Sequence, residues 1–286
     1  MQDYIIITDS GSDLPERTLA ELGIPSVPLN CFMKDEPAKA VTLRGKAFYD
    51  ELRAGKIACT SAANLSLFRE EFSKALQAGK DILYLAFSSA LSCMFATARI
   101  AAEELSEEYP ERCIRVIDTR CASLGEGLLV HLAAMQKATG VSLEELAAYI
   151  ENKKYYMMHW FTVDDLIFLK RGGRLNAVSA FAGTLLGIKP VLTVSHEGKL
   201  TPAEKQRGRK NAILALAKHY AAECADCALP VYIAQADAQD TAVQLKDILM
   251  KEHGAKQVTI GELGPVIGAH TGPGLIALFF VGQQPV

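Results

Sequence analysis

The stretch DILYLAF-SSALS-CMFATARIAAEEL, residues 81–105, decides the fold. Its first seven residues form a short, continuous apolar run, which is typical of a strand buried on both faces of a parallel sheet. A serine-rich turn follows, and then an alanine-rich helical run extends through Leu105. Strand, polar turn and helix in this order predict one repeat of a parallel α/β sheet.

The same order recurs on both sides of this stretch. Residues 4–7 are short and β-branched, and helix-period apolar residues follow at 14–22. Residues 113–117 form a third apolar run, and a helical pattern starts near Leu124. The first half is therefore predicted to be an α/β domain with a parallel sheet.

The second half has a different pattern. Its strand-like runs are 157–163, 189–194, 199–201, 231–234, 257–260 and 275–281. Glu197-Gly198 is typical of a hairpin turn, and helical patterns cover 164–170 and 210–222. A polar, lysine-bearing stretch at 151–156 suggests the junction. We expect an N-terminal domain over 1–155 and a C-terminal α/β domain with a mixed sheet over 156–286.

The bulk composition narrows the class of protein. Half of the 286 residues are hydrophobic and 22% are charged, so the chain can bury a sizeable core. The net charge of −3 makes nucleic acid or an anionic membrane a poor default partner. The start lacks a signal-peptide pattern, and no apolar stretch reaches the length of a spanning helix, so we expect a cytoplasmic protein.

The cysteines give no metal site. There are seven, and Cys224-Ala-Asp-Cys227 is a lone C-x-x-C with no second pair and no H-x-x-x-H after it. We interpret these cysteines as small apolar residues and expect no bound metal.

Small hydroxyl residues gather after the expected strands. They are Thr8-Asp9-Ser10, Thr60-Ser61, Ser88–Ser92 and Asp118-Thr119. Ligands of open α/β sheets lie beyond the carboxyl ends of the strands, and hydroxyls at a helix start suit an anion or a carbonyl. The alternative, that each is a plain helix cap, is the better interpretation for any one residue. A phosphate-binding loop and a serine-hydrolase elbow are both missing from the sequence.

His270 stands in the glycine- and proline-rich stretch GPVIGAHTGPG, residues 264–274, which is expected to be a loop. Its imidazole could donate to a carboxylate or phosphate, or it could satisfy loop carbonyls; the sequence leaves both open. A second cluster is cationic, with Arg171 and Arg174 around Gly172-Gly173 and Arg207 further on. The planar guanidinium of arginine suits binding to a phosphate, a carboxylate or a partner protein. The commoner interpretation of such a cluster is a basic surface exposed to solvent.

Together these stretches resemble the DegV family of bacterial fatty-acid-binding proteins. The motifs that carry the resemblance are TDSGSDL at 8–14, Thr60-Ser61, SSALS at 88–92, VIDT at 116–119 with SLG at 123–125, LKRGGRL at 169–175, GIKP at 187–190 and GPVIGAHTGPG at 264–274. Each motif is modest alone, but their number and order over the whole chain are specific.

The resemblance implies a two-domain α/β fold that binds a long-chain fatty acid at or near the domain junction. Thr60, Ser61, Ser92 and His270 would contact the carboxylate, and the acyl tail would be buried. The chain would have no catalytic residue and no cofactor besides the bound fatty acid. It would be the acyl-binding subunit of a fatty acid kinase system, presenting the carboxylate to a separate ATP-dependent kinase subunit. Arg174, Arg171 and Arg207 become candidate contacts for a phosphate or for the kinase.

The sequence departs from the family pattern at two places. Cys93-Met94 stand where Gly-Thr is usual, and Ala63 stands where a proline is usual. We expect both to change the edge of the pocket. The tail lining is expected to include the apolar residues Phe161, Leu166, Phe181, Leu185 and Ile188.

Two other function classes remain open from the residues alone. One is a hydrolase or transferase of acyl or phosphoryl groups, with Ser92 or Ser89 as nucleophile, His270 as base, and Asp9 or Asp118 orienting the histidine. The other is a sensor whose partner contacts depend on bound lipid.

Overall fold

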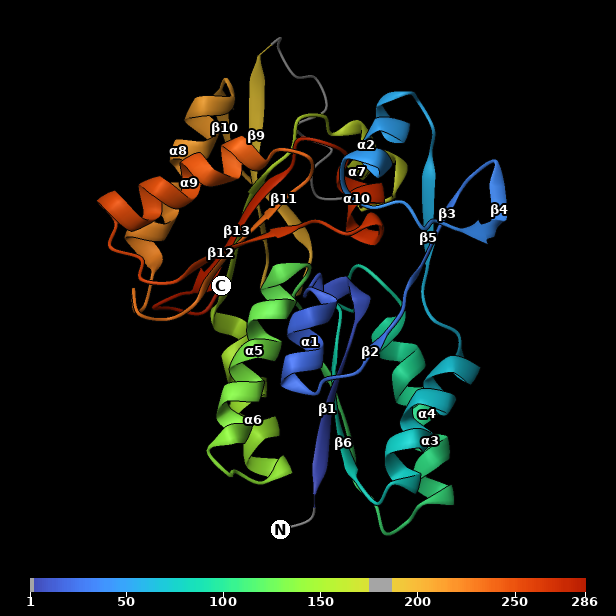
Figure 1. Ribbon diagram of the computed structural model, residues 1–286. Helices are drawn as coiled ribbons and strands as arrows, with labels where there is room; N and C mark the ends of the chain where they lie inside the picture. The colour runs from blue at the N-terminus through green and yellow to red at the C-terminus, as the bar shows by residue number, and fades with distance from the viewer. Residues whose placement is uncertain (1–2, 175–186) are drawn as a thin grey trace.

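The computed structural model describes residues 3–174 and 187–286. Figure 1 shows two α/β layers stacked end to end, with the N-terminus at the far end of the first. The first sheet has the order β2-β1-β6-β7, and all of its neighbouring strands are parallel. Its strands are β1 (Tyr4–Asp9), β2 (Ser26–Val27), β6 (Asp81–Ala86) and β7 (Ile114–Asp118). The predicted parallel sheet is confirmed.

Helices cover both faces of this sheet, as the continuous apolar runs require. The central strand β6 is buried at all six positions. Its alternate residues Ile82 and Tyr84 pack with α3 (Leu65–Gln77) and α4 (Met94–Glu108). Leu83 and Leu85 face the other way, toward the side covered by α5 (Leu124–Ala138) and α6 (Leu143–Lys153). The short helix α1 (Glu16–Leu22) lies on the same side as α5 (Figure 1).

The second sheet has six strands in the order β10-β9-β8-β13-β11-β12. They are β8 (Met157–Thr162), β9 (Ile188–Val194), β10 (Leu200–Arg207), β11 (Val231–Gln235), β12 (Val258–Glu262) and β13 (Ile276–Val281). Only β11 and β12 pair in parallel, so the predicted mixed sheet is confirmed. Helices α8 (Arg209–Glu223) and α9 (Gln239–Glu252) cover its outer face, and α5 packs on the inner one.

A third, antiparallel sheet was not predicted. It has the order β4-β3-β5 and is formed by β3 (Asn30–Met33), β4 (Glu36–Ala40) and β5 (Ala58–Ser61). Strands β3 and β5 pack against α10 (Pro265–Thr271), with α2 (Gly45–Arg53) and α7 (Ile167–Arg171) nearby (Figure 1). Thr60 and Ser61 therefore lie within a strand of this small sheet. The expectation that they follow a strand of the main parallel sheet is wrong.

The expectation that His270 lies in a loop is also wrong, because His270 lies in the last turn of α10, which runs over Pro265–Thr271 and has Gly272 as its C-cap. Residues 151–156, expected to join the two parts, contain the end of α6, which runs to Lys153, and a turn of 3₁₀ helix, η2 (Lys154–Tyr156), that leads directly into β8. The division at 155/156 stays a prediction; the parallel sheet precedes it and the mixed sheet follows it, while the small sheet from the first half packs on α10.

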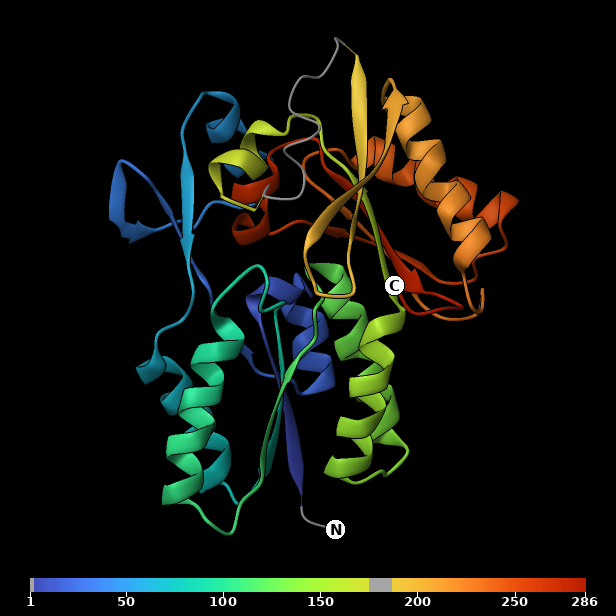
Figure 2. The ribbon, with the colours of Figure 1, turned by 180° about the vertical axis from the view of Figure 1, so that it is seen from behind.

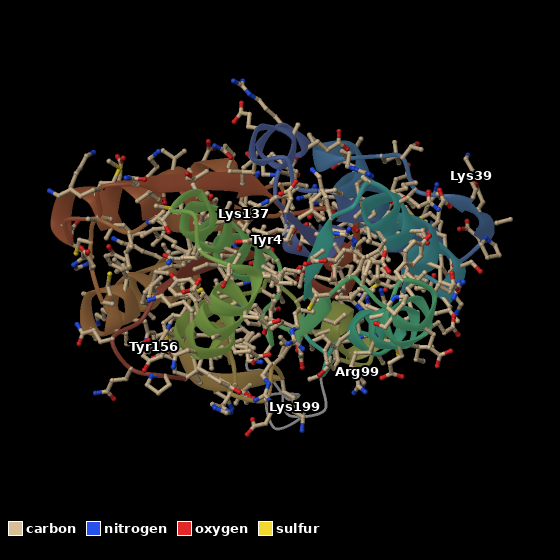
Figure 3. All side chains as sticks on the ribbon, turned by 90° about the horizontal axis from the view of Figure 1, so that it is seen from below. Tyr4, Lys39, Arg99, Lys137, Tyr156 and Lys199 are labelled. Carbon is tan, nitrogen blue, oxygen red and sulfur yellow. The ribbon has the colours of Figure 1, made fainter. Side chains whose placement is uncertain are left out.

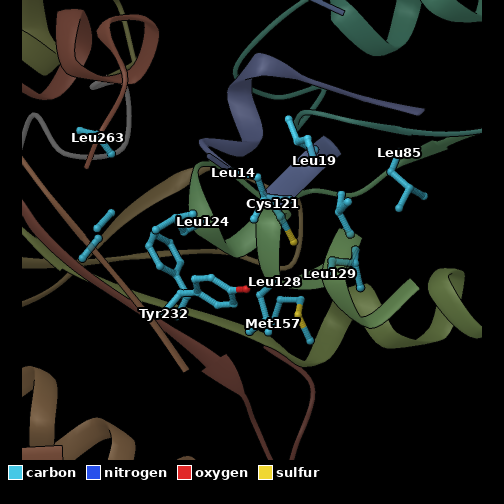
Figure 4. Packing of buried hydrophobic residues seen from close by; sticks show 14 of the residues in the cluster. Leu14, Leu19, Leu85, Cys121, Leu124, Leu128, Leu129, Met157, Tyr232 and Leu263 are labelled. Carbon is cyan, nitrogen blue, oxygen red and sulfur yellow. The ribbon is translucent and has the colours of Figure 1, made fainter. Parts of the chain in front are cut away.

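Helix α5 lies between the two large sheets and contributes to one continuous core. Nine of its 15 residues are buried. Figure 4 shows Leu124 and Leu128 beside Tyr232 of the second sheet, with Leu85 of the first sheet in the same cluster. At the far end of α5, Lys137 points to Tyr4 and donates to its carbonyl at 2.7 Å (Figure 3). None of the helices in the described parts of the chain is both long enough and apolar enough to span a bilayer.

The tip of the β9–β10 hairpin is fastened to the carboxyl end of the first sheet (Figure 2). Ser88 Oγ donates to the Gly198 carbonyl at 2.9 Å, and Arg120 Nη1 donates to the His196 carbonyl at 3.0 Å. The His196 ring stacks on Tyr155 with centroids 4.3 Å apart. Gly198 has φ +77°, and a Cβ there would overlap Ser88 Oγ. The turn therefore needs glycine for its conformation and for its close approach.

Replacing Gly198 by alanine should lower the free energy of unfolding by about 2–4 kcal/mol, because left-handed strain and overlap with Ser88 add together. Gly23→Ala is the matched control, since Gly23 has φ +64° with nothing within 4 Å of an added Cβ. That variant should lose only about 1 kcal/mol. Chemical denaturation of both variants measures the difference; equal losses would mean that the hairpin contact is not tight.

Candidate ligand-binding site

A largely apolar cavity lies where the first, second and third sheets meet. Its described walls come from both halves of the chain and include Leu29, Phe87, Leu91, Leu263, Val266 and Phe279. Phe161, expected in the tail lining, is among the wall residues. Leu166 and Ile188 are not among the described wall residues, and Phe181 and Leu185 lie outside the described residues.

Four predicted site residues, Thr60, Ser61, Ser92 and His270, all line this cavity. Thr60 Oγ1 and His270 Nε2 are 2.7 Å apart, although 210 residues separate them in the sequence. Strand β5 presents Thr60, and the last turn of α10 presents His270. The Ser61 hydroxyl accepts from Asn30 Nδ2 at 3.3 Å, which leaves its own proton free to donate.

His270 is a neutral imidazole near neutral pH. Burial and the positive charge of Arg174 lower its pKa to about 4. Its Nδ1 is buried without a hydrogen-bond partner among the described residues. Gly172 lies against that nitrogen so closely that a Cβ there would overlap it. Gly172, the first glycine of the LKRGGRL stretch, thus makes room for the histidine ring.

Arg174 ties two parts of the site together. Its Nε and Nη2 donate to the Leu91 carbonyl at 3.1 and 2.9 Å, and its Nη1 donates to the Gly172 carbonyl. The guanidinium therefore holds the loop that carries Ser92 against the end of α7. It also brings a positive charge to the polar end of the cavity, which favours an anionic ligand group.

The other predicted cations lie elsewhere. Arg171 is exposed and lines a second cavity together with Lys56, Arg174, Thr60 and His270. The two cavities thus share their polar wall. Arg207 is exposed at the end of β10 and is not among the described residues that line either cavity.

Met94 and Ala63, which stand at the two departures from the family pattern, are in contact with each other. Met94 is fully buried, and its sulfur accepts the Ala63 main-chain N–H at 3.2 Å. A proline at 63 would have no N–H to satisfy. Met94 packs with the α3–α4 side of the first sheet, so the expectation that it changes the pocket edge is wrong; Cys93 is the residue that lines the cavity.

The described hydrogen bonds do not assemble a catalytic triad. His270 Nε2 is bonded to Thr60. Ser89 donates to Asp118 at 2.5 Å, on the far side of its turn. Asp9 accepts from Tyr84 and from the main chain of Phe87 and Gly11. Among residues 3–174 and 187–286, no three side chains of His, Cys, Asp or Glu converge as metal ligands.

A second histidine, not expected from the sequence, lines the same cavity. His159 is 2% exposed on β8. Its Nδ1 lies 2.8 Å from the Met157 carbonyl, and its Nε2 accepts from Ala122 N at 3.3 Å. Burial lowers its pKa to about 4. A neutral ring with both nitrogens occupied can serve as a wall against an apolar ligand.

Comparison with known proteins agrees with this architecture. A model of the family described as "Uncharacterised protein, DegV family" matches residues 4–283. The chain belongs to the DegV family. A DegV domain-containing protein of Clostridium perfringens is 40% identical over 99% of this chain and 99% of its own length.

Solved DegV structures have the same fold. A DegV family protein from Thermus thermophilus, reported for its fatty acid binding, matches with a TM-score of 0.86 and 31% identity over 99% of this chain and 100% of that one. A fatty acid binding DegV family protein from Streptococcus agalactiae matches with a TM-score of 0.86 and 28% identity over the same shares. The DegV resemblance inferred from the sequence motifs is confirmed.

Protonation of His159 should destabilise the protein in acid. Its folded-state pKa lies below its unfolded value, so its contribution to stability is complete above about pH 6.5 and is lost as the pH falls toward 4. The stability advantage of wild type over His159→Gln should shrink by about 3 kcal/mol over this range.

His219→Gln is the control for that experiment. Burial lowers the pKa of His219, but its hydrogen bonds to the Glu223 and Glu204 carboxylates outweigh burial and raise it. The advantage of wild type over this variant should change in the opposite direction, being largest in acid and lost as the pH rises. Denaturant unfolding from pH 4 to 8 measures both; a flat difference for His159 would contradict its burial as a neutral ring.

Proposed function

We propose that the protein binds a long-chain fatty acid without covalent attachment. The observation that carries the proposal is an apolar cavity whose polar end combines Thr60 and His270 with the Ser61 and Ser92 hydroxyls. The fatty acid binding reported for the Thermus and Streptococcus relatives supports the same ligand here.

A fatty acid has an apolar tail and a charged carboxylate, and the two ends contribute differently to binding. Each buried methylene contributes about 0.8 kcal/mol, so a long tail can supply most of the affinity. The carboxylate then needs only a few donors, and the hydroxyls of Thr60, Ser61 and Ser92 are such donors. Arg174 lowers the electrostatic cost of bringing the carboxylate to the cavity.

Protein purified under native conditions should carry a stoichiometric mass that denaturation releases as a long-chain fatty acid. In delipidated protein, Ser92→Ala with His270→Ala should weaken fatty acid binding about 10- to 100-fold, because hydrogen bonds to a charged group are lost. Ser89→Ala is the matched control: Ser89 stands in the same turn but faces Asp118, and it should bind like wild type. Native mass spectrometry and titration calorimetry test this; protein that is apo and takes up no added fatty acid would refute the proposal.

We further propose that the chain presents the carboxylate to a separate ATP-dependent kinase subunit and is not itself the catalyst. The kinase would transfer the γ-phosphoryl group of ATP to a carboxylate oxygen, giving an acyl phosphate and ADP. The second cavity beside Thr60 and His270, with Arg171, Arg174 and Lys56 in its wall, supports this by offering cations next to the carboxylate end. Arg171 and Arg207 are exposed and available to an acidic partner surface.

Arg171→Glu should slow acyl phosphate formation by the cognate kinase at least tenfold while fatty acid affinity changes less than threefold. Charge repulsion would weaken docking, or the stabilisation of phosphate, without touching the tail cavity. Arg99→Glu is the control, because Arg99 is an exposed arginine of α4 that is not among the described residues lining either cavity, and this variant should leave the rate unchanged. Hydroxamate trapping of the acyl phosphate measures the rate; equal rates for both variants would contradict the placement of the kinase at Arg171.

A further inference from the structure

The turn after β1 contributes no side chain to the described lining of the cavity, yet it carries a partly buried carboxylate that bonds to two segments in the cavity walls. Asp13 lies just after the 3₁₀ turn η1 (Ser10–Ser12). Its Oδ2 accepts from Ser123 Oγ at 2.6 Å, and its Oδ1 accepts from Gly264 N at 3.0 Å. The partners are 110 and 251 residues away in the sequence.

Both partners begin segments that line the cavity. Ser123 itself is a wall residue and immediately precedes α5. Gly264 precedes α10, and the segment it starts includes the wall residues Val266, Ile267 and His270. A single carboxylate therefore fixes the distance between the first turn of α5 and the helix that carries His270.

Both residues of the Asp13–Ser123 hydrogen bond have unusual backbone angles. Ser123 has φ 53° and ψ −144°, a region that is almost restricted to glycine, and Asp13 has φ 52°. Ser123 occupies the N-cap position of α5 but makes no capping hydrogen bond, because its hydroxyl goes to Asp13. Strained residues persist only where their surroundings over-determine them. The hydrogen bond to Asp13 is the contact that does so here.

The Asp13 carboxylate also lies very close to the main chain at Gly264. A Cβ at 264 would come within 2.7 Å of Asp13 Oδ1, so only glycine lets the main chain approach the carboxylate. The neighbouring Leu263 carbonyl accepts from Tyr49 at 2.8 Å, which fixes the segment from the other side. Burial raises the pKa of Asp13 to about 7, although the hydrogen bonds from Ser123 and Gly264 lower it.

We propose that Asp13 is a positioning residue for the fatty acid site, holding the Ser123 wall and the α10 wall in the spacing that ligand binding needs. This inference rests on the proposed fatty acid binding. Asp13 acts through its hydrogen bonds to the two segments, because its carboxylate is not in the described cavity lining.

The test uses full-length delipidated protein and titration with palmitic and oleic acid. Asp13→Gly removes the carboxylate but tolerates the left-handed backbone, and it should weaken binding at least tenfold. Asp13→Asn keeps both contacts, since its amide oxygen can accept from Gly264 and its amide nitrogen can donate to Ser123. It should bind within threefold of wild type.

Ser123→Gly removes one contact without backbone strain and should weaken binding about three- to tenfold. Combining it with Asp13→Gly should add nothing further, because the same contact has already been lost. Asp81 is the control: it is a buried aspartate at the start of β6, and its carboxylate accepts the main-chain N–H of Cys113 at 3.0 Å. Asp81→Ala should lower stability but leave the affinity of the folded protein within twofold.

Hydrogen exchange separates this proposal from the function on which it rests. Asp13→Gly should speed amide exchange over 263–271 and 122–128, and Asp13→Asn should not, whether or not fatty acid is the ligand. Unchanged exchange in Asp13→Gly would overturn the proposal. It would also be overturned if Asp13→Asn bound as weakly as Asp13→Gly, or if Asp81→Ala weakened binding equally. If the wild-type protein binds no fatty acid, the proposed function is overturned. The hydrogen-exchange measurement then tests the role of Asp13 by itself.

Discussion

The fold depends on how closely the first turn of α5 fits between the two large sheets. A Cβ at Gly125 would overlap the His159 ring of the second sheet, and a Cβ at Gly127 would press on the Ser12 carbonyl in the turn that follows β1 of the first sheet. Two glycines one residue apart therefore let a single helix touch both layers. Because α5 is buried on both sides, the two sheets share one core and neither can shift far without exposing it.

That arrangement also explains why the polar groups of the junction are so deeply buried. Asp9 and Glu126 are fully buried there, and the partly buried Asp13 lies beside them. Desolvation raises the pKa of each: to about 6 for Asp9, to about 7 for Asp13, and well above its usual value for Glu126. Their hydroxyl and main-chain donors recover part of the cost of desolvation. The cavity opens beside this network, so its apolar walls rest on a rigid polar frame.

The sequence predicted the parts of the fold whose patterns are local. Buried strands such as β6 are continuous apolar runs, and their alternation with helices predicts the parallel sheet. The small sheet was missed because β4 is exposed at all five positions and has no apolar period. Helix α10 was hidden by its glycines, although Pro265 at its start, Gly272 at its end and the four-residue spacing of Val266 and His270 are helix signals. The Thr60–His270 pair came only from family resemblance, because no physical rule joins residues 210 apart. No local sequence pattern indicated His159 or Asp13 as site residues, because tertiary packing determines their partners.

The position of β13 in the second sheet has a consequence for biosynthesis. Strand β13 is the last strand in the sequence, yet it pairs with β8 on one side and β11 on the other, in the middle of the sheet. Domains generally fold as units during synthesis, N-terminal parts first. The parallel sheet can form while the ribosome is still translating, but the mixed sheet cannot close until residues 276–281 have emerged. The cavity wall formed by Ala277 and Phe279 is therefore completed only after these residues have emerged, and a ligand can be enclosed only after that point.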